Sequence, residues 1–293
     1  MLHQGSSRAR SWCQSTSKVL KEYFRPQQRN VSVSRLNTHF LEVGEGRSVA
    51  YQIIPGQRKP TVVMIPGLHS YTHMNGQKAS CLLRYCDMHD YSCVVYDHEC
   101  SGQSSKGHLK KVLFTNWVED ALAVTEKLTE GPVVLVGSSI GGWLSIITGL
   151  KLKERLHGLV LFSPALNYVW QHYHRHKAQL PPDTRRRLEA GDPHVHTHEY
   201  GNALLKEDFA ADSLQYELDL SKTLDITCPV RIIHGLNDRE IPSDQSMKLC
   251  LSLASEDVDL IYRKNSTHQL ESPPDLELFL TTLDRMIKDN PVR

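Results

Sequence analysis

The strongest constraint on this chain is a G-x-S-x-G motif that lies between a strand-like run and a helix-like run. The β-branched run at 133–136 predicts a strand that leads directly into Gly137-Ser138-Ser139-Ile140-Gly141, and a helix-compatible run continues to Leu150. A turn this tight needs glycines where side chains would collide, and it projects the serine hydroxyl above the sheet edge. We therefore predict that Ser139 is a nucleophile and that Ser138 is structural. An incidental serine in a glycine turn is the alternative.

Strand-like and helix-like runs alternate along most of the remaining chain. Residues 39–43 and 48–54 predict a hairpin, and apolar strand-like runs follow at 61–65, 93–96, 133–136, 159–162, 230–233 and 258–262. Amphipathic stretches at 77–88 and 115–128 predict helices between them. Because such apolar strands suit a sheet covered on both faces, we expect an α/β fold with a mainly parallel sheet flanked by helices. The polar, histidine-rich stretch at about 166–223 is expected to be a cap inserted between two strands.

A serine nucleophile needs a base, and the base needs an acid to orient it. In the fold that carries this motif, the acid follows the serine along the chain and the histidine comes last. Asp238 follows a glycine-containing turn just after the run at 230–233, and His268 lies a few residues beyond the last predicted strand. We predict Asp238 as the acid and His268 as the base. A turn-capping role is the alternative for Asp238, and Asp225 and Asp244 are weaker candidates for the acid.

The oxyanion formed in acyl transfer needs two backbone N–H donors. Ile140 begins the predicted helix after the serine, so its N–H is one expected donor. The second is expected from the loop after the third strand, where Pro66-Gly67-Leu68 follows the run at 61–65. Gly67 lets the backbone bend back over the serine, which makes the N–H of Leu68 the expected donor. A plain strand-ending turn is the alternative.

Taken together, these motifs resemble the α/β-hydrolase family over about residues 41–288. The resemblance is carried by Ile65-Pro66-Gly67, Met74–Ala79, Val136–Leu144, Cys228–Arg231, His234-Gly235 with Asp238, and Asp257–His268. Within the family, these segments are most similar to a branch of mitochondrial palmitoyl-protein thioesterases that also cleave an acyl glucuronide. The resemblance implies Ser139 as nucleophile, Asp238 as acid and His268 as base, with S-acylated proteins or small acyl esters as substrates.

Two departures from the family pattern bear on the substrate preference and on the oxyanion donor. Cys100 stands where the family loop has its first glycine, and the loop from Leu68 to Asn75 is longer than expected. The residues also leave open a short-chain carboxylesterase, or a non-catalytic binding protein on the same fold.

Composition and charge argue against two other classes of protein, nucleic-acid-binding proteins and membrane-spanning proteins. The chain has 34 Lys+Arg against 33 Asp+Glu, a net charge of +1, which gives no electrostatic reason to expect a nucleic-acid partner. No run of about 18 apolar residues is present, so we expect no membrane span.

Two histidine-rich runs, at 172–176 and 194–198, invite a metal-site interpretation. In an extended segment each would place three imidazoles on one side, as a zinc ion could use. Neither run has a cysteine pair or the H-E-x-x-H helical spacing. We therefore expect solvated histidines, no metal and no cofactor.

The first 30 residues differ in composition from the rest, which we assign to a hydrolase domain at 36–293. They carry six basic side chains against one acid, Glu22, with five serines between the positive charges. An arginine-rich, serine-rich, acid-poor amphipathic segment is typical of a mitochondrial transit peptide. We expect import into mitochondria, with the matrix as destination. A basic tail that carries no address is the alternative.

We predict that residues 1–30 fused to a fluorescent reporter direct it to mitochondria. Replacing Arg8 and Arg10 with Glu should abolish import, because two positive charges of the basic segment become negative. Confocal co-localisation with a mitochondrial dye measures the outcome, and a wild-type fusion that stays cytosolic would contradict the prediction.

Overall fold

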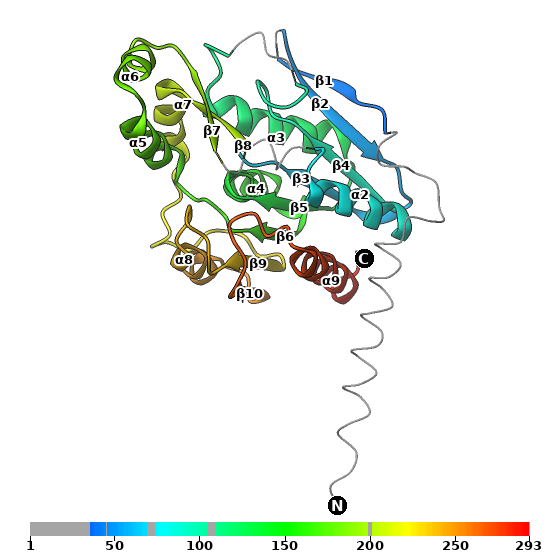
Figure 1. The fold of residues 1–293 in the computed structure, drawn as a ribbon. Coiled ribbons are helices and arrows are strands. Elements are labelled where there is room, and N and C mark those ends of the chain that lie inside the picture. Colours follow the sequence, from blue (N-terminus) through cyan, green and yellow to red (C-terminus); the bar gives the residue numbers. More distant parts are fainter. Residues whose placement is uncertain (1–35, 45, 69–73, 105–108, 199–200, 293) are drawn as a thin grey trace, which may run out of the picture.

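A central, mainly parallel sheet organises the molecule (Figure 1). The computed structural model describes residues 36–44, 46–68, 74–104, 109–198 and 201–292, so the predicted leader lies outside the described residues. The strands of this sheet are β1 (His39–Gly44), β2 (Arg47–Ile54), β3 (Arg58–Ile65), β4 (Tyr91–Tyr96), β5 (Val133–Ser138), β6 (Leu156–Phe162), β9 (Val230–Gly235) and β10 (Val258–Arg263). Their spatial order is β1-β2-β4-β3-β5-β6-β9-β10. The two edge pairings β1–β2 and β2–β4 are antiparallel, and all the others are parallel. The predicted α/β class, the hairpin and the later strands are confirmed.

Helices pack on both faces of this sheet (Figure 1). The helices are α2 (Gln77–His89), α3 (Phe114–Leu128), α4 (Ile140–Leu152), α5 (Val169–Gln179), α6 (Pro182–Glu189), α7 (Glu207–Asp212), α8 (Asp244–Ser252) and α9 (Pro273–Asp289), with 3-10 turns η3 (Lys153–Arg155) and η4 (Ser213–Tyr216). Both predicted helices are present, and the strand-to-helix turn leads into α4 as expected. In the part of the chain that the structure describes, no helix has the length and apolar character needed to cross a membrane.

The two faces of β5 show why its sequence is apolar throughout. Successive side chains of a strand point to opposite faces. Val133 and Leu135 therefore join the core cluster of α3 and α4, while Val134 and Val136 join the cluster that includes residues of α2 and α9. Because each face is covered by helices, a polar residue at any of these positions would be buried without a partner.

The segment at 166–223 separates β6 from β9, two strands that pair directly in the sheet. It contains α5, α6 and α7, η4 and a small antiparallel hairpin of β7 (His194–His198) and β8 (Gly201–Leu205). Its apolar side chains join the core on the α3 and α4 side: the ring of Phe209 packs 5.0 Å from Trp117 and 5.8 Å from Phe114. The segment therefore packs against the same body that carries the serine turn.

The strand order creates a switch point at the centre of the sheet. From β3 the chain crosses to β4 on one side, and from β4 it returns past β3 to β5 on the other side. In open α/β sheets, ligands bind outside the carboxyl ends of the strands at such a reversal. The predicted site residues follow the carboxyl ends of β3, β5, β9 and β10, so the topology directs them to one edge.

Candidate active site

The backbone at Ser139 has an unusual conformation between β5 and α4. Its φ of 58° and ψ of −123° lie in a region that costs a non-glycine residue about 1–3 kcal/mol. The neighbouring glycines make this turn possible. A Cβ at Gly137 would lie 2.3 Å from Ser145 Oγ, and a Cβ at Gly141 would lie 2.2 Å from the carbonyl oxygen of Ile65. The predicted strained turn is therefore present, and the glycines are required by close packing.

A chain of hydrogen bonds joins three residues that are far apart in the sequence. The hydroxyl of Ser139 donates to His268 Nε2 at 2.9 Å, and His268 Nδ1 donates to Asp238 Oδ2 at 2.7 Å. Ionised Asp238 can only accept, which places the proton of the neutral imidazole on Nδ1 and leaves Nε2 as the acceptor. The structure thus brings Ser139, His268 and Asp238 together in the order expected of nucleophile, base and acid.

Asp238 is held by donors on both of its oxygens. Its Oδ1 accepts from the backbone N–H groups of Glu240 at 2.8 Å and Ile241 at 2.9 Å. Its Oδ2 also lies 3.3 Å from Nε2 of a second imidazole, His234. His234 Nε2 is 3.2 Å from the carbonyl of Ile241 as well, so this nitrogen faces two acceptors and carries the proton. Its Nδ1 then accepts from the hydroxyl of Ser246 at 2.6 Å.

These contacts decide the charge of the acid. Burial alone would raise the pKa of Asp238, but hydrogen bonds from His234, His268 and the Ile241 N–H hold that pKa well below its usual range. Asp238 is therefore ionised at neutral pH. No role was predicted for His234 from the sequence, although a histidine at the end of a buried strand, four residues before the acid, was the available signal.

The loop that carries His268 is tied to the acid turn and to α9. The N–H of Asn237 donates to the carbonyl of Ser266 at 3.0 Å. Asp275, near the start of α9, accepts from Ser266 Oγ at 2.6 Å and from Arg263 at 3.0 Å. These bonds fix the position of the imidazole relative to the carboxylate.

Lys78 provides a second support for the same loop. Its side chain is 1% exposed, and its ammonium donates to the carbonyl of Gln269 and, at 3.2 Å, to Glu271. Burial lowers the pKa of Lys78, while Glu271 opposes that effect. Lys78 lies at the start of α2, so it connects this helix to the residue directly after His268. This role of Lys78 was not predicted from the sequence.

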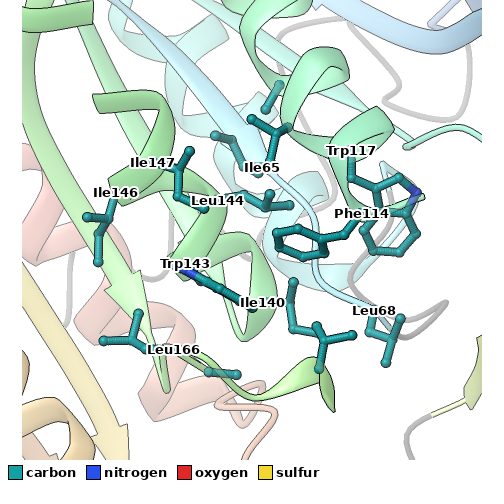
Figure 2. Packing of buried hydrophobic residues seen from close by; sticks show 14 of the residues in the cluster. Ile65, Leu68, Phe114, Trp117, Ile140, Trp143, Leu144, Ile146, Ile147 and Leu166 are labelled. Carbon is teal, nitrogen blue, oxygen red and sulfur yellow. The ribbon is translucent and has the colours of Figure 1, made fainter. Parts of the chain in front are cut away.

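The two expected oxyanion donors lie at the same apolar cluster. Ile140 is the first residue of α4, so its N–H has no partner within the helix. Leu68 follows β3 and is buried in the cluster that also contains Ile140, Phe114 and Trp143 (Figure 2). Residues 69–73, most of the longer loop, lie outside the described residues. The donor roles of Leu68 and Ile140 remain predictions.

The loop after β4 shows what the replaced glycine required. Cys100 has a φ of 61°, in the left-handed region where glycine is favoured. Gly102 retains its glycine, and a Cβ there would collide with the carboxylate of Asp97. That carboxylate accepts from the N–H groups of Gln103 at 2.8 Å and Met74 at 3.0 Å. Cys100 therefore adopts the left-handed conformation that a glycine would take at lower cost, and Asp97 holds the loop beside it.

The histidines at 172–176 do not lie in an extended segment, and the expectation that they are solvated is wrong for two of them. They belong to helix α5, where His172 and His176 are 2% and 8% exposed and share one face. His174 lies between them in sequence and is exposed. The second run, at 194–198, does lie in a strand, β7.

Comparisons with known proteins place the fold and the site in context. The model of the serine aminopeptidase S33 family (Hydrolase_4) matches residues 56–275. The mitochondrial palmitoyl-protein thioesterase ABHD10 of Rattus norvegicus is 30% identical over 248 residues, which cover 85% of this chain and 82% of the relative. The Homo sapiens protein of the same name is 29% identical over 252 residues, covering 85% and 79%.

Solved structures agree with this similarity. The alpha/beta hydrolase domain-containing protein 10 from mouse superposes with a TM-score of 0.73 at 28% identity, over 86% of this chain and 99% of its own. A putative hydrolase from Agrobacterium vitis S4 gives a TM-score of 0.74 at 27% identity with the same coverage.

We predict that Asp238→Asn weakens the acid sensitivity of folding. Because the pKa of Asp238 is lowered in the folded state, its carboxylate stabilises the fold at pH values above the pKa of an aspartate in the unfolded chain, about 3.9. That contribution is lost as the pH falls below about 4 toward the folded pKa. Urea unfolding measured at intervals from pH 6 to pH 2 should give a steeper loss of the free energy of unfolding for wild type than for the variant. Parallel curves would contradict the assignment.

Proposed function

The chain belongs to the serine aminopeptidase S33 family of α/β hydrolases, and we propose that it is a serine hydrolase that cleaves acyl thioesters and esters through an acyl-enzyme. The observation that carries the proposal is the hydrogen-bonded series from Ser139 through His268 to Asp238, with Ser139 on a strained turn. A hydroxyl bonded to a neutral imidazole nitrogen can lose its proton as it attacks a carbonyl.

In the first half of the reaction, Ser139 Oγ attacks the acyl carbonyl while His268 Nε2 takes the serine proton. Asp238 stabilises the imidazolium that forms, because its carboxylate is already bonded to Nδ1. The N–H groups of Ile140 and Leu68 donate to the oxyanion of the tetrahedral intermediate. The carbon–sulfur or carbon–oxygen bond then breaks, and His268 returns the proton to the leaving thiol or alcohol.

In the second half, water replaces the leaving group. His268 takes a proton from the water as its oxygen attacks the acyl-serine carbonyl, and the same donors bind the second oxyanion. Collapse of that intermediate breaks the bond to Ser139 Oγ, and His268 gives the proton back to the serine. The fatty acid leaves, and the chain needs no cofactor in this cycle.

The proposed substrates are S-acylated proteins, with palmitoyl as the acyl group, and acyl glucuronides. The name shared by the rat and human relatives, palmitoyl-protein thioesterase, supports the first. The apolar cluster beside the serine supports a long acyl chain, because it joins Leu68 and Ile140 of the body to Leu166 and Phe209 of the 166–223 segment. That segment is the proposed cap, and an acyl chain would lie beneath it.

The leaving group explains how one site accepts both substrates. A thioester carbonyl is less resonance-stabilised than that of an oxygen ester, and the glucuronide of an acyl glucuronide is an activated leaving group. Binding energy from the acyl side, about 0.8 kcal/mol for each buried methylene, then serves both. A short-chain carboxylesterase and a non-catalytic binding protein are the alternatives.

We also propose that the protein works in the mitochondrial matrix. The composition of residues 1–30 supports this, as does the word mitochondrial in the names of the relatives. A substrate in that compartment would be a matrix protein acylated on cysteine, or a small acyl ester.

Labelling by a fluorophosphonate probe tests the nucleophile. We expect wild type and Ser138→Ala to label equally, and Ser139→Ala to label not at all and to lose about 10⁴-fold or more in kcat. Ser138 is the matched control because it is also a buried serine of the same turn. In-gel fluorescence and intact mass measure the result. Full labelling of Ser139→Ala would overturn the nucleophile, and an unlabelled wild type would support a binding protein.

A chain-length series tests the substrate. We expect kcat/KM on acyl thioesters to rise several-fold for each pair of added carbons, because each methylene that leaves water for an apolar surface adds binding energy. The rise should end when the chain fills the space beneath the proposed cap. Amides of the same acids should react far more slowly. Steady-state kinetics from acetyl to palmitoyl, each against its matched amide, measures this. A preference for acetyl would indicate the short-chain carboxylesterase, and comparable amide cleavage would indicate a peptidase.

A further inference from the structure

A cluster of two imidazoles and one carboxylate lies beside the acid turn, and no step of the proposed reaction uses it. His172 and His176 come from helix α5 of the 166–223 segment, and Glu240 comes from the turn after β9. One ligand atom from each of the three residues can be chosen so that all lie within 4.8 Å of one another. The two imidazole ring centroids are 4.2 Å apart. Both histidines are buried, and the Glu240 side chain is 18% exposed.

The spacing and the chemistry of these residues suit a transition-metal ion. Residues four apart on a helix are neighbours on one face, which is how helical histidine pairs bind zinc. Two imidazoles and a carboxylate, with a fourth position left for water, form a known zinc ligand set. Tetrahedral coordination with bonds of about 2.0–2.1 Å needs ligand atoms about 3.3–3.4 Å apart. The three ligand atoms, which lie within 4.8 Å of one another, must therefore approach by up to about 1.5 Å to bind one ion.

The present partners of Glu240 can be exchanged. The hydroxyl of Tyr168 donates to Glu240 Oε2 at 3.3 Å, and Arg175 Nη1 lies 3.8 Å from the same oxygen. The Arg175 side chain is 44% exposed, so it can move into solvent when a cation arrives. The hydroxyl of Tyr168 also accepts a hydrogen bond from Arg175. This second bond survives only if the side chains of Tyr168 and Arg175 move together away from Glu240.

We propose that His172, His176 and Glu240 form an inhibitory zinc site that clamps the 166–223 segment onto the acid turn. Glu240 is two residues from Asp238, and its N–H donates to Asp238 Oδ1 at 2.8 Å. Ser139 and His268 are only 5% and 4% exposed, and apolar side chains of the 166–223 segment pack into the core beside Ser139, so we expect the entry of a long acyl group to displace part of that segment. A cation bound to residues of both parts opposes that displacement, because opening would break its coordination.

Cobalt binding tests the site itself. Co²⁺ replaces Zn²⁺ in nitrogen and oxygen sites and gives visible d–d absorption when four-coordinate. We expect metal-free wild type to bind one equivalent with these bands and Zn²⁺ to abolish them by displacement. His176→Gln and Glu240→Gln should lose the bands, while His174→Gln, the same substitution at the exposed histidine of that helix, should keep them. Equal bands in His174→Gln and His176→Gln would overturn the site.

The change in Tm on adding Zn²⁺ tests the site even if a variant is less stable, because each protein is compared with itself without metal. Zn²⁺ should raise the Tm of wild type and His174→Gln, because an ion that binds only the folded state stabilises it. It should leave the Tm of His176→Gln and Glu240→Gln unchanged. An equal rise in all four proteins would place the ion elsewhere, for example at the histidines of β7, and would overturn the proposal.

The inhibition measurement rests on the proposed function, whereas cobalt binding and the Tm shift do not. Failure of the zinc site can therefore be distinguished from failure of the proposed function. We expect Zn²⁺ to lower kcat/KM for a long-chain thioester at least several-fold in wild type and His174→Gln, and to change it little in His176→Gln, each protein being compared with itself without metal. Chelation of the purified protein should leave the rate unchanged or raise it. Equal inhibition of His176→Gln would show that zinc acts at the triad, and binding without inhibition would remove the clamp.

Discussion

The conformation of Ser139 is the constraint from which the arrangement of the site follows. A φ of 58° in a non-glycine residue persists only when the surroundings hold it. Here the turn is held by Ser139 N–H donating to the carbonyl of Phe162 at 2.8 Å and by its own carbonyl accepting from Gly142 and Ala165. These partners come from β6, from α4 and from the loop after β6. The sheet, the helix and the loop that leads into the 166–223 segment therefore meet at one residue, and moving any of them would move its hydroxyl.

The acid and the base depend on a second set of fixed contacts. Asp238 is ionised in a buried place because two imidazoles and two backbone N–H groups donate to it. His268 is oriented by that carboxylate and by its loop, which Asp275 holds at Ser266 and Lys78 holds at Gln269. A carboxylate in this position stabilises an imidazolium without moving, and this preorganisation lowers the barrier to proton transfer from the serine.

The sequence predicts the parts of this structure that local patterns determine. These local signals are the strand-like run at 133–136, the glycines beside Ser139, and the placement of Asp238 and His268 after predicted strands. The structure brings Ser139, Asp238 and His268 together. The roles of Lys78 and Asp275 depend on which loops meet in space, and no spacing along the chain indicates that. His234 differs, because its place at the end of a buried strand, four residues before the acid, was a usable signal.

The histidines of α5 show a different limit. The positions buried along this helix, Val169, His172, Tyr173 and His176, recur at helical spacing. Two of them are polar residues, so the apolar periodicity that would have revealed the helix is hidden. The two imidazoles also make the inner face of α5 chemically distinct from the aliphatic rest of the core.

Rapid-quench peptide mass spectrometry tests most directly whether Ser139 becomes acylated. Wild-type protein is mixed with an activated long-chain acyl ester, quenched with acid within the pre-steady-state burst, digested and sequenced by fragmentation. We expect one acyl group, in ester linkage to the Ser139 hydroxyl, whose amount equals the burst and decays at the turnover rate. A burst with the acyl group on Ser138 or on a cysteine, or turnover with no acylated peptide at any time, would contradict it.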